Sequence, residues 1–304
     1  MIQPPLLFLS NIIIDEVVLP NGVRHPGMLG GAATYAAIGA AGYWPQVSIV
    51  AGVGSDFGPL GSDRLIRLGI RPEGLLERDP HTIRNTLVYR EEAERTETPA
   101  FGPDHFRRMQ ITPRDIPATL LPAVGCYVFR DLAADFWQAL RQHRAELGMV
   151  FWELQASIAQ GPCWPQVRAL LPGVEVFSLN RAEAVGLLGS CDAMATVEEL
   201  LQAGAPVVVL RMGADGAWLA TARQRLRLYP PPSPVVDVTG AGNAFCGGFL
   251  AQWCASGGDL ESSGRAGAAA AALCMSTFGP PEQVDRAALS AWAAATRIEH
   301  IRSS

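Results

Sequence analysis

One stretch decides the fold of this chain: VVDVTGAGNAFCGGF, residues 235–249. It predicts a strand end, a Gly-rich turn and a helix that begins near Ala241. Gly240 and Gly242 allow a ligand to approach the backbone closely. A helix start presents unpaired N–H groups and the positive end of the helix dipole, so Gly240, Ala241 and Gly242 predict an anion hole suited to phosphate. A Gly-rich turn between a strand and a helix is also common where nothing binds, so the turn alone leaves both interpretations open.

The whole stretch resembles the signature of the PfkB or ribokinase-like carbohydrate kinases, which runs Asp-Thr-x-Gly-Ala-Gly-Asp and then x-Phe-x-Gly-Gly. The residues in the matching places are Asp237, Thr239, Gly240, Ala241, Gly242, Phe245, Gly247 and Gly248. The last Asp of the family signature, its catalytic base, is Asn243 in this chain. The resemblance implies an α/β fold, a ribokinase-like three-layer sandwich with a mainly parallel central sheet and a small β lid.

A second motif, residues 30–41, opens with two glycines and predicts a helix rich in small residues. Tight helix packing would explain it without any ligand. It also resembles the family's Gly-Gly-x-x-x-Asn-x-Ala motif, although the Asn is Tyr35 here, so that a phenol replaces an amide that fixes hydroxyl groups. Residues 6–15 predict one continuous buried strand that ends in Asp15. The resemblance implies that the substrate is bound by the following residues: Asn11, Asp15, Gly30, Gly31 and Tyr35.

Residues 174–219 contain several residues that are candidates for binding a nucleotide. Asn180 and Glu183 are three positions apart at a helix start, which is typical of a capping box; the resemblance implies in addition that Glu183 organises Mg²⁺, through water. Arg211 is either a solvated surface charge or a partner for phosphate. The resemblance implies nucleotide contacts from the following residues: Asn180, Arg211, Gly213, Gly216, Asp237 and Thr239. It implies ATP as co-substrate and leaves room for a monovalent cation. Glu153 ends another buried strand, and we expect it to cap the following loop rather than to touch substrate.

Two short β-rich segments, at about 16–28 and 85–98, lie outside the alternation of strands and helices. The first predicts a hairpin with Asn21-Gly22 as its turn. In the resembled family such segments form a lid over the substrate and often a homodimer contact. Because no linker divides the chain, we expect residues 1–304 to form a single domain.

Composition narrows the function classes. The chain has 304 residues, 49% hydrophobic and 17% charged, with a net charge of −5, so a large core is expected and nucleic acid is not an expected partner. All 24 basic residues are Arg, which excludes a Schiff-base lysine and a Walker-type Gly-Lys loop. The six Cys match no zinc pattern and indicate free thiols in a reducing cytoplasm. The apolar segments are too short to span a membrane.

These observations predict ATP-dependent phosphorylation of a hydroxyl on a sugar, nucleoside or related small polyol. Asn243 is neutral and cannot accept the hydroxyl proton. A catalytically weak or inactive pseudokinase, which binds nucleotide or sugar as a sensor, is therefore the alternative. On the sequence alone, replacing Asn243 with Asp is expected to raise phosphoryl transfer in a competent site.

Overall fold

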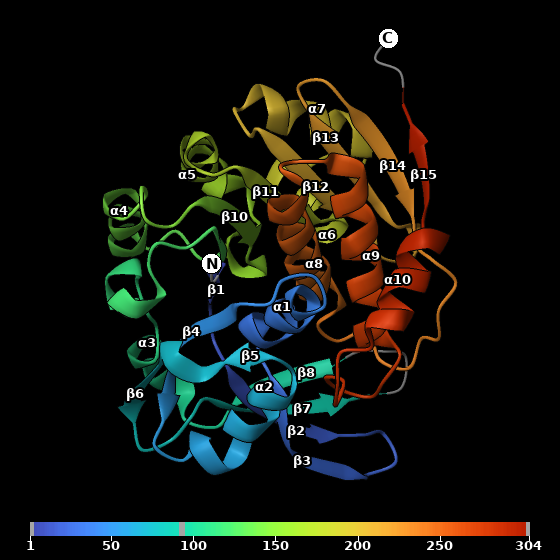
Figure 1. Ribbon diagram of the computed structural model, residues 1–304. Helices are drawn as coiled ribbons and strands as arrows, with labels where there is room; N and C mark the ends of the chain where they lie inside the picture. Colours follow the sequence, from blue (N-terminus) through green and yellow to red (C-terminus); the bar gives the residue numbers. More distant parts are fainter. Residues whose placement is uncertain (1–2, 91–94, 302–304) are drawn as a thin grey trace.

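The computed structural model describes residues 3–90 and 95–301. Among them, eleven strands form a central sheet that runs through the molecule (Figure 1). Along the sheet the order is β15 (Arg297–His300), β14 (Arg225–Tyr229), β13 (Ala217–Thr221), β12 (Val207–Arg211), β11 (Val176–Asn180), β10 (Met149–Leu154), β9 (Gly125–Arg130), β1 (Leu6–Leu9), β4 (Val47–Gly54) and β5 (Ile70–Arg71), with β6 (Leu75–Asp79) also paired to β4. Within this sheet, β12, β11, β10, β9, β1, β4, β5 and β6 run parallel to one another. Strands β13, β14 and β15 are each antiparallel to their neighbours.

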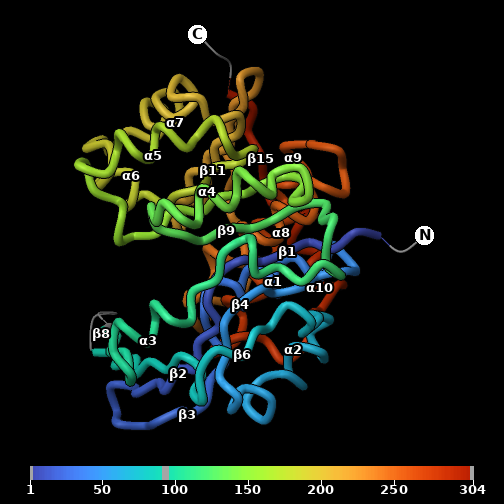
Figure 2. Tube along the Cα trace, turned by 90° about the vertical axis from the view of Figure 1, so that its left-hand side faces the viewer, coloured from blue at the N-terminus to red at the C-terminus, as the bar shows by residue number. Residues whose placement is uncertain are grey.

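Helices cover both faces of this sheet (Figure 2). One layer contains α1 (Ala32–Ala41), α8 (Ala241–Ser256), α9 (Leu260–Met275) and α10 (Arg286–Ala295), and the other contains α4 (Ala134–Gln142), α5 (Trp164–Leu170), α6 (Arg181–Leu188) and α7 (Ala193–Gln202). Successive side chains of the inner strands point to opposite faces of the sheet and enter one or the other of two large buried clusters. The sequences of these strands are therefore continuous apolar runs. The predicted three-layer α/β sandwich with a mainly parallel sheet is confirmed.

A second, four-stranded sheet lies beside the carboxyl edge of the first, at the bottom of Figure 1. Its strands, in order, are β3 (Arg24–Gly30), β2 (Ile13–Val18), β7 (Arg84–Tyr89) and β8 (Arg95–Pro99). The predicted hairpin forms β2 and β3, and its turn contains Gly22 at φ +81°. Residues 91–94 of the second predicted lid segment lie outside the described residues.

The prediction of one strand over residues 6–15 is wrong. The chain leaves the central sheet after Leu9 and enters the small sheet at Ile13, so Asp15 lies on β2 and not at the end of a central strand. The apolar run hid this change, because β1 is fully buried whereas β2 mixes buried and half-buried residues. Such a mixture over six residues is masked in the sequence when both classes of position hold Ile or Val.

Helix α8 packs against α1 at very short range. A methyl group built on Gly247 would lie 1.8 Å from the carbonyl oxygen of Ala36, and one on Gly39 would lie 2.2 Å from that of Ala244. Small residues on both helices therefore serve close packing, as the alternative interpretation of residues 30–41 expected. This contact fixes the start of α8 relative to α1. No helix within the described part of the chain is long and apolar enough to cross a membrane.

Candidate active site

The predicted anion hole is the start of α8. Gly240 is the residue before the helix and has left-handed backbone angles (φ +76°, ψ −4°), which Gly adopts without strain. The Ala241 N–H donates to the Val238 carbonyl oxygen (3.2 Å), and no side chain among the described residues caps this helix start, so the N–H groups after Ala241 are the ones that can face an anion. The ring of Tyr35 lies directly against Gly240, since a methyl group there would sit 2.1 Å from Tyr35 Cγ. Glycine is thus required by both conformation and space.

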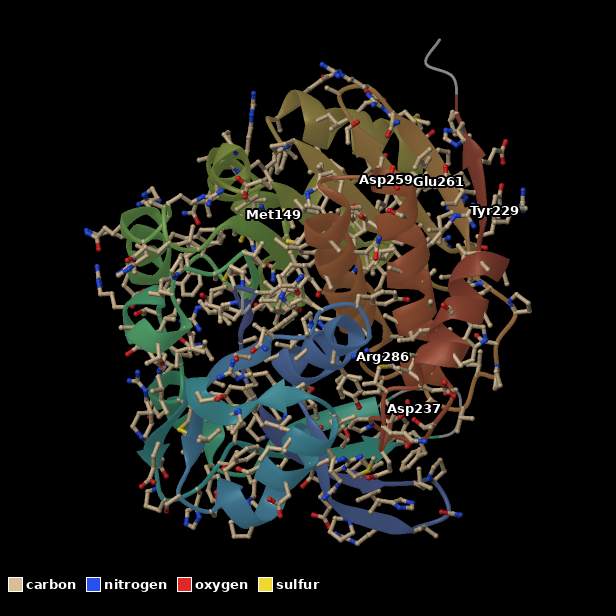
Figure 3. The ribbon with its side chains drawn as sticks, viewed as in Figure 1. Met149, Tyr229, Asp237, Asp259, Glu261 and Arg286 are labelled. Atoms are coloured by element: carbon tan, nitrogen blue, oxygen red, sulfur yellow. The ribbon has the colours of Figure 1, made fainter. Side chains whose placement is uncertain are left out.

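Asp237 joins two loops beside this turn. Its Oδ1 accepts a hydrogen bond from the Thr239 N–H (2.9 Å), and its Oδ2 accepts one from the Gly279 N–H (3.1 Å). Figure 3 places Asp237 at the lower right of the molecule, near the ends of the lid strands. Because both carboxylate oxygens are engaged with backbone, Asp237 is a structural link between the turn and the loop after α9.

Four of the residues predicted to bind the substrate lie close together where the four-stranded sheet meets the start of α1: Asn11, Asp15, Gly30 and Gly31. A methyl group on Gly30 would lie 2.1 Å from Asp15 Oδ2, and one on Gly31 would lie 2.4 Å from the Asn11 carbonyl oxygen. Asp15 therefore lies immediately over the first glycine of the motif. Burial, and then the nearby Cys274, Asp237 and Asp15, raise the pKa of Tyr35 well above its ordinary value, so its phenol stays protonated. The acceptor side thus combines one buried carboxylate with one neutral phenol.

A buried ionic network lies under the anion hole, where β10, β11 and β12 end side by side. Arg211 Nη1 lies 2.7 Å from Glu153 Oε1, and Arg211 Nη2 lies 3.6 Å from Glu183 Oε2. The Arg211 side chain is only 11% exposed and the Glu153 side chain 3%. Although burial lowers it, the negative charges of Glu153 and Glu183 hold the pKa of Arg211 above its ordinary value. A methyl group on Gly242 would meet Arg211 Nη1 at 2.2 Å, so this cation lies directly beneath the glycine turn.

This network corrects two sequence-based interpretations. Arg211 is not a solvated surface charge, and Glu153 does not cap a loop. The sequence showed each of them as a charged residue at the end of a buried strand, and only the sheet order β10-β11-β12 brings these ends together.

Asn243 extends the network to the first turn of α8. Its Nδ2 lies 3.2 Å from both the Tyr127 hydroxyl and Glu153 Oε2, and the Tyr127 hydroxyl donates to the same carboxylate oxygen (2.6 Å). Sequence reasoning missed Tyr127, because a Tyr within the apolar strand β9 gives no signal by itself. Its position opposite Phe151 on β10 is what places its hydroxyl beside Glu153.

Asn180 and Glu183 form the predicted capping box at the start of α6. Asn180 Oδ1 accepts from the Glu183 N–H (2.9 Å), and Glu183 Oε2 accepts from the Asn180 N–H (2.7 Å). Burial raises the pKa of Glu183, although Arg211 and the Asn180 N–H act in the opposite direction. No group of three or more His, Cys, Asp or Glu within the described ranges is arranged to bind a metal directly.

Gly213 and Gly216 shape the turn between β12 and β13. Both have positive φ, +61° and +83°, around the short helical turn Gly213–Asp215. A methyl group on Gly216 would lie 2.0 Å from the Leu228 carbonyl oxygen, so this glycine is explained by backbone packing. The two glycines position the turn that follows Arg211, and Gly213 has open space around it.

Among the described residues, the four-stranded sheet, which is the predicted lid, contacts the Gly240 turn and the loop after α9 at three points. The Tyr89 hydroxyl and Thr239 Oγ1 are 2.9 Å apart, the His25 and Phe278 rings are 4.8 Å apart between centroids, and Met28 lies against Gly279. The strands of this sheet therefore lie against the Gly240 turn and the loop after α9. Replacing Tyr89 with Phe removes one hydrogen bond worth about 1 kcal/mol, so we expect a roughly fivefold rise in acceptor KM in a turnover assay and an unchanged fold by circular dichroism. An unchanged KM would show that this contact does not hold the lid.

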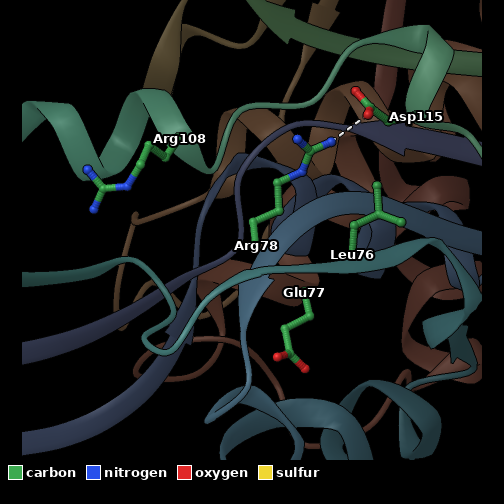
Figure 4. Close-up of a pocket in the computed structure, with 5 residues that line it drawn as sticks. All are labelled: Leu76, Glu77, Arg78, Arg108 and Asp115. Atoms are coloured by element: carbon green, nitrogen blue, oxygen red, sulfur yellow. Dashed lines mark hydrogen bonds and ion pairs between the residues drawn. The ribbon is translucent and has the colours of Figure 1, made fainter.

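A separate hollow lies on β6, near α3 (Gly102–Arg108) and the turn Pro113–Asp115. Figure 4 shows its lining residues, Leu76, Glu77, Arg78, Arg108 and Asp115. Arg78 pairs with Asp115, and Arg108 pairs with Asp79, so its cations are neutralised locally. None of the residues predicted for the active site lines it.

The sequence and the fold of this chain are similar to those of known kinases. Residues 29–285 match the model of the pfkB family carbohydrate kinases. An uncharacterised sugar kinase of Archaeoglobus fulgidus is 33% identical over 117 residues, which is 38% of this chain and 46% of that protein. Cytidine kinase of Thermococcus kodakarensis is 25% identical over 284 residues, 90% of this chain and 97% of that enzyme. The structure of Arabidopsis thaliana ribokinase complexed with ribose and ATP has the same fold, with a TM-score of 0.74, 19% identity, and coverage of 96% of this chain and 99% of that one. The chain is a member of the pfkB family of carbohydrate kinases.

Proposed function

We propose that this protein transfers the γ-phosphoryl group of ATP to a hydroxyl group of a sugar, nucleoside or related small polyol. The observation that carries the proposal is the uncapped glycine start of α8, which is enclosed by the lid and lies above Arg211. Arg211 Nε and Nη2 are buried and make no hydrogen bond within the described residues, so an added acceptor such as a phosphate oxygen would satisfy a costly deficit.

The nucleoside end of ATP has a fitting surface beside this turn. Val235, Val236 and Val238 are 65%, 59% and 66% exposed, and they lie in the segment that leads into Gly240. Three exposed apolar side chains this close to the glycine turn suit the flat face of a base. Glu183 would hold hydrated Mg²⁺, which when bound neutralises charge on the transferring phosphate.

The acceptor hydroxyl would be held by Asp15 and by Asn243. In the transfer, the bond from the acceptor oxygen to the γ-phosphorus forms and the bond from this phosphorus to the ADP oxygen breaks. Asp237 is engaged through both carboxylate oxygens, so the hydroxyl proton would pass to the transferred phosphate or to water. Without a base on the protein the rate of this step is lower by a factor on the order of 10²–10⁴, but the contributions of positioning and charge stabilisation to the rate remain.

The test is acceptor-dependent ADP formation by the purified protein with ATP and Mg²⁺, over a panel of sugars, nucleosides and polyols. Turnover with any acceptor would establish the activity and its substrate class. The second candidate function, a pseudokinase that senses nucleotide or sugar, is favoured by Asn243 alone. ATP binding in a thermal-shift assay without turnover over the whole panel would establish it instead.

Replacing Asp15 with Asn is expected to lower kcat/KM for the acceptor by about 10- to 100-fold, because hydrogen bonds from sugar hydroxyls to a charged carboxylate are worth roughly 1.5–3 kcal/mol. The Kd for ATP should stay within about twofold of wild type, since Asp15 lies on the acceptor side. Glu16→Gln is the matched control, because Glu16 is the next residue on β2 and pairs with Arg24 in solvent. Equal losses in both variants would contradict the assignment of Asp15.

A further inference from the structure

The side-chain amide of Asn243 has only one orientation that satisfies its neighbours. It faces Glu153 Oε2 and the Tyr127 hydroxyl, each at 3.2 Å. The ionised carboxylate of Glu153 can only accept, and the Tyr127 proton is already given to that same carboxylate at 2.6 Å. The Asn243 atom that faces them must therefore be the N–H₂ donor, and its carbonyl oxygen points away from Glu153.

The carboxylate that fixes this amide is itself fixed. Glu153 Oε1 receives Arg211 Nη1 at 2.7 Å, and its side chain is 3% exposed. Thus one buried acid accepts from three donors on three different elements: Arg211 on β12, Tyr127 on β9 and Asn243 on α8. Such a fully paired buried carboxylate holds its neighbours rigidly, because any displacement would leave a charge or donor unsatisfied.

We propose that Glu153 carries the negative charge of the catalytic centre in this protein and acts as a positioning residue, which holds Asn243 with its carbonyl oxygen towards the acceptor hydroxyl. The role in catalysis rests on the proposed function; the orientation of the amide does not. In this arrangement Asn243 accepts the hydrogen bond of the attacking hydroxyl and orients its oxygen, while the negative charge remains behind Asn243, on Glu153, where it is paired with Arg211.

The arrangement changes the expected effect of Asn243→Asp. Among the residues that the structure describes, the ionisable groups that face Glu153 are Tyr127 on β9, Arg211 on β12, Glu183 on α6 and Cys246 on α8, and of these only Arg211 is a cation. An Asp at position 243 would set a second carboxylate about 3 Å from Glu153, where two negative charges cannot both be kept without strong repulsion. The single substitution is thus expected to destabilise the site at neutral pH instead of restoring a base.

The experiment compares the wild type with Asn243→Asp, Glu153→Gln and the exchange Asn243→Asp/Glu153→Gln. Melting temperatures are measured from pH 5.5 to 8. In Asn243→Asp the acid pair takes up one proton in the folded state, so its pKa there is raised above the unfolded value, and stability is lost as the pH rises. We expect its deficit against wild type to grow by about 5 °C or more over this range. The exchange variant carries one acid and should show no such growth.

Asn21→Asp is the matched control, because Asn21 lies exposed in the β2–β3 turn and a carboxylate introduced there would lie in solvent. Kinetics with ATP, Mg²⁺ and either cytidine or ribose supply the second readout. Glu153→Gln should lower kcat by roughly 10- to 100-fold and leave the KM for ATP within about twofold.

A pH-independent deficit in Asn243→Asp, or an exchange variant whose deficit equals the sum of the two single deficits, would overturn the proposal even if the wild type turns over. The expected pH dependence together with no turnover in any variant would support the placement of Asn243 and overturn the proposed function. If Asn243→Asp does not fold, a folded exchange variant with a flat pH profile still supports the proposal, and an unfolded one overturns it.

Discussion

Replacing Arg211 with Met is expected to destabilise the protein by about 3–5 kcal/mol, the cost typical of removing one partner from a buried ion pair. Arg211 is the only cation among the described groups that face Glu153, and it also lies 3.6 Å from Glu183. Met fills a similar volume but leaves two buried carboxylates without a positive charge. Chemical denaturation at pH 7.5 measures the loss, and acceptor-dependent turnover should disappear with it.

The pH dependence of this loss has a definite sign. Without Arg211 the carboxyl groups of Glu153 and Glu183 are protonated more readily in the folded state, so their folded pKa values rise above the unfolded value of about 4.3. A raised folded pKa adds stability that is present at low pH and is lost as the pH rises through it. The difference between Arg211→Met and wild type should therefore be smaller at pH 5 than at pH 8. Burial already raises the pKa of Glu183 in the wild type, which is consistent with this direction.

Arg107→Met is the control for Arg211→Met. Arg107 pairs with Asp104 on the surface, where the two side chains are 71% and 73% exposed. Exposed pairs contribute at most about 1 kcal/mol, so this variant should match wild type at both pH values. A loss of similar size in both variants, or a difference that grows towards acid pH, would contradict the network described for Arg211.

Replacing Gly240 with Ala is expected to lower turnover by about 100-fold, since misplacement of the anion hole by about 1 Å is enough for such a loss. The added methyl group would lie 2.1–2.4 Å from three ring atoms of Tyr35, so the turn or the ring must move. The left-handed backbone at φ +76° adds a further cost of roughly 1–2 kcal/mol for any residue with a Cβ.

The other end of α8 provides a matched control for Gly240→Ala. Gly257 follows the helix with φ +69°, and a methyl group there meets nothing within 4 Å. Gly257→Ala thus carries the same backbone strain without the overlap, and it should retain turnover and the Kd for ATP. If both variants lose the same stability and activity, strain alone explains Gly240 and the contact with Tyr35 is irrelevant.

Much of the fold could be predicted from the chain alone. The buried strands β4, β9, β10, β11 and β12, the helix starting at Ala241 and the hairpin around Asn21-Gly22 follow from apolar runs, glycines and turn residues close together in sequence. Strands β5, β6 and β15, at the edges of the sheet, were not predicted. The capping box of Asn180 and Glu183 was predictable for the same reason, because its two partners are three residues apart. The division of residues 6–15 between two sheets was not, since Ile and Val occupy both strands and give the same local signal.

The candidate site likewise has features that the sequence predicts and features that depend on the tertiary structure. The sequence by itself determined the glycine turn at Gly240–Gly242, the two glycines at 30 and 31, and the presence of Asn243 in place of an acid. Only the tertiary structure decided that Glu153, Arg211 and Tyr127 meet beneath Asn243, because strands β9, β10 and β12 are far apart in the chain and are aligned by the order of the parallel sheet. A local conformation is encoded by neighbouring residues, whereas the pairing of a buried charge depends on which strand ends the fold brings into contact.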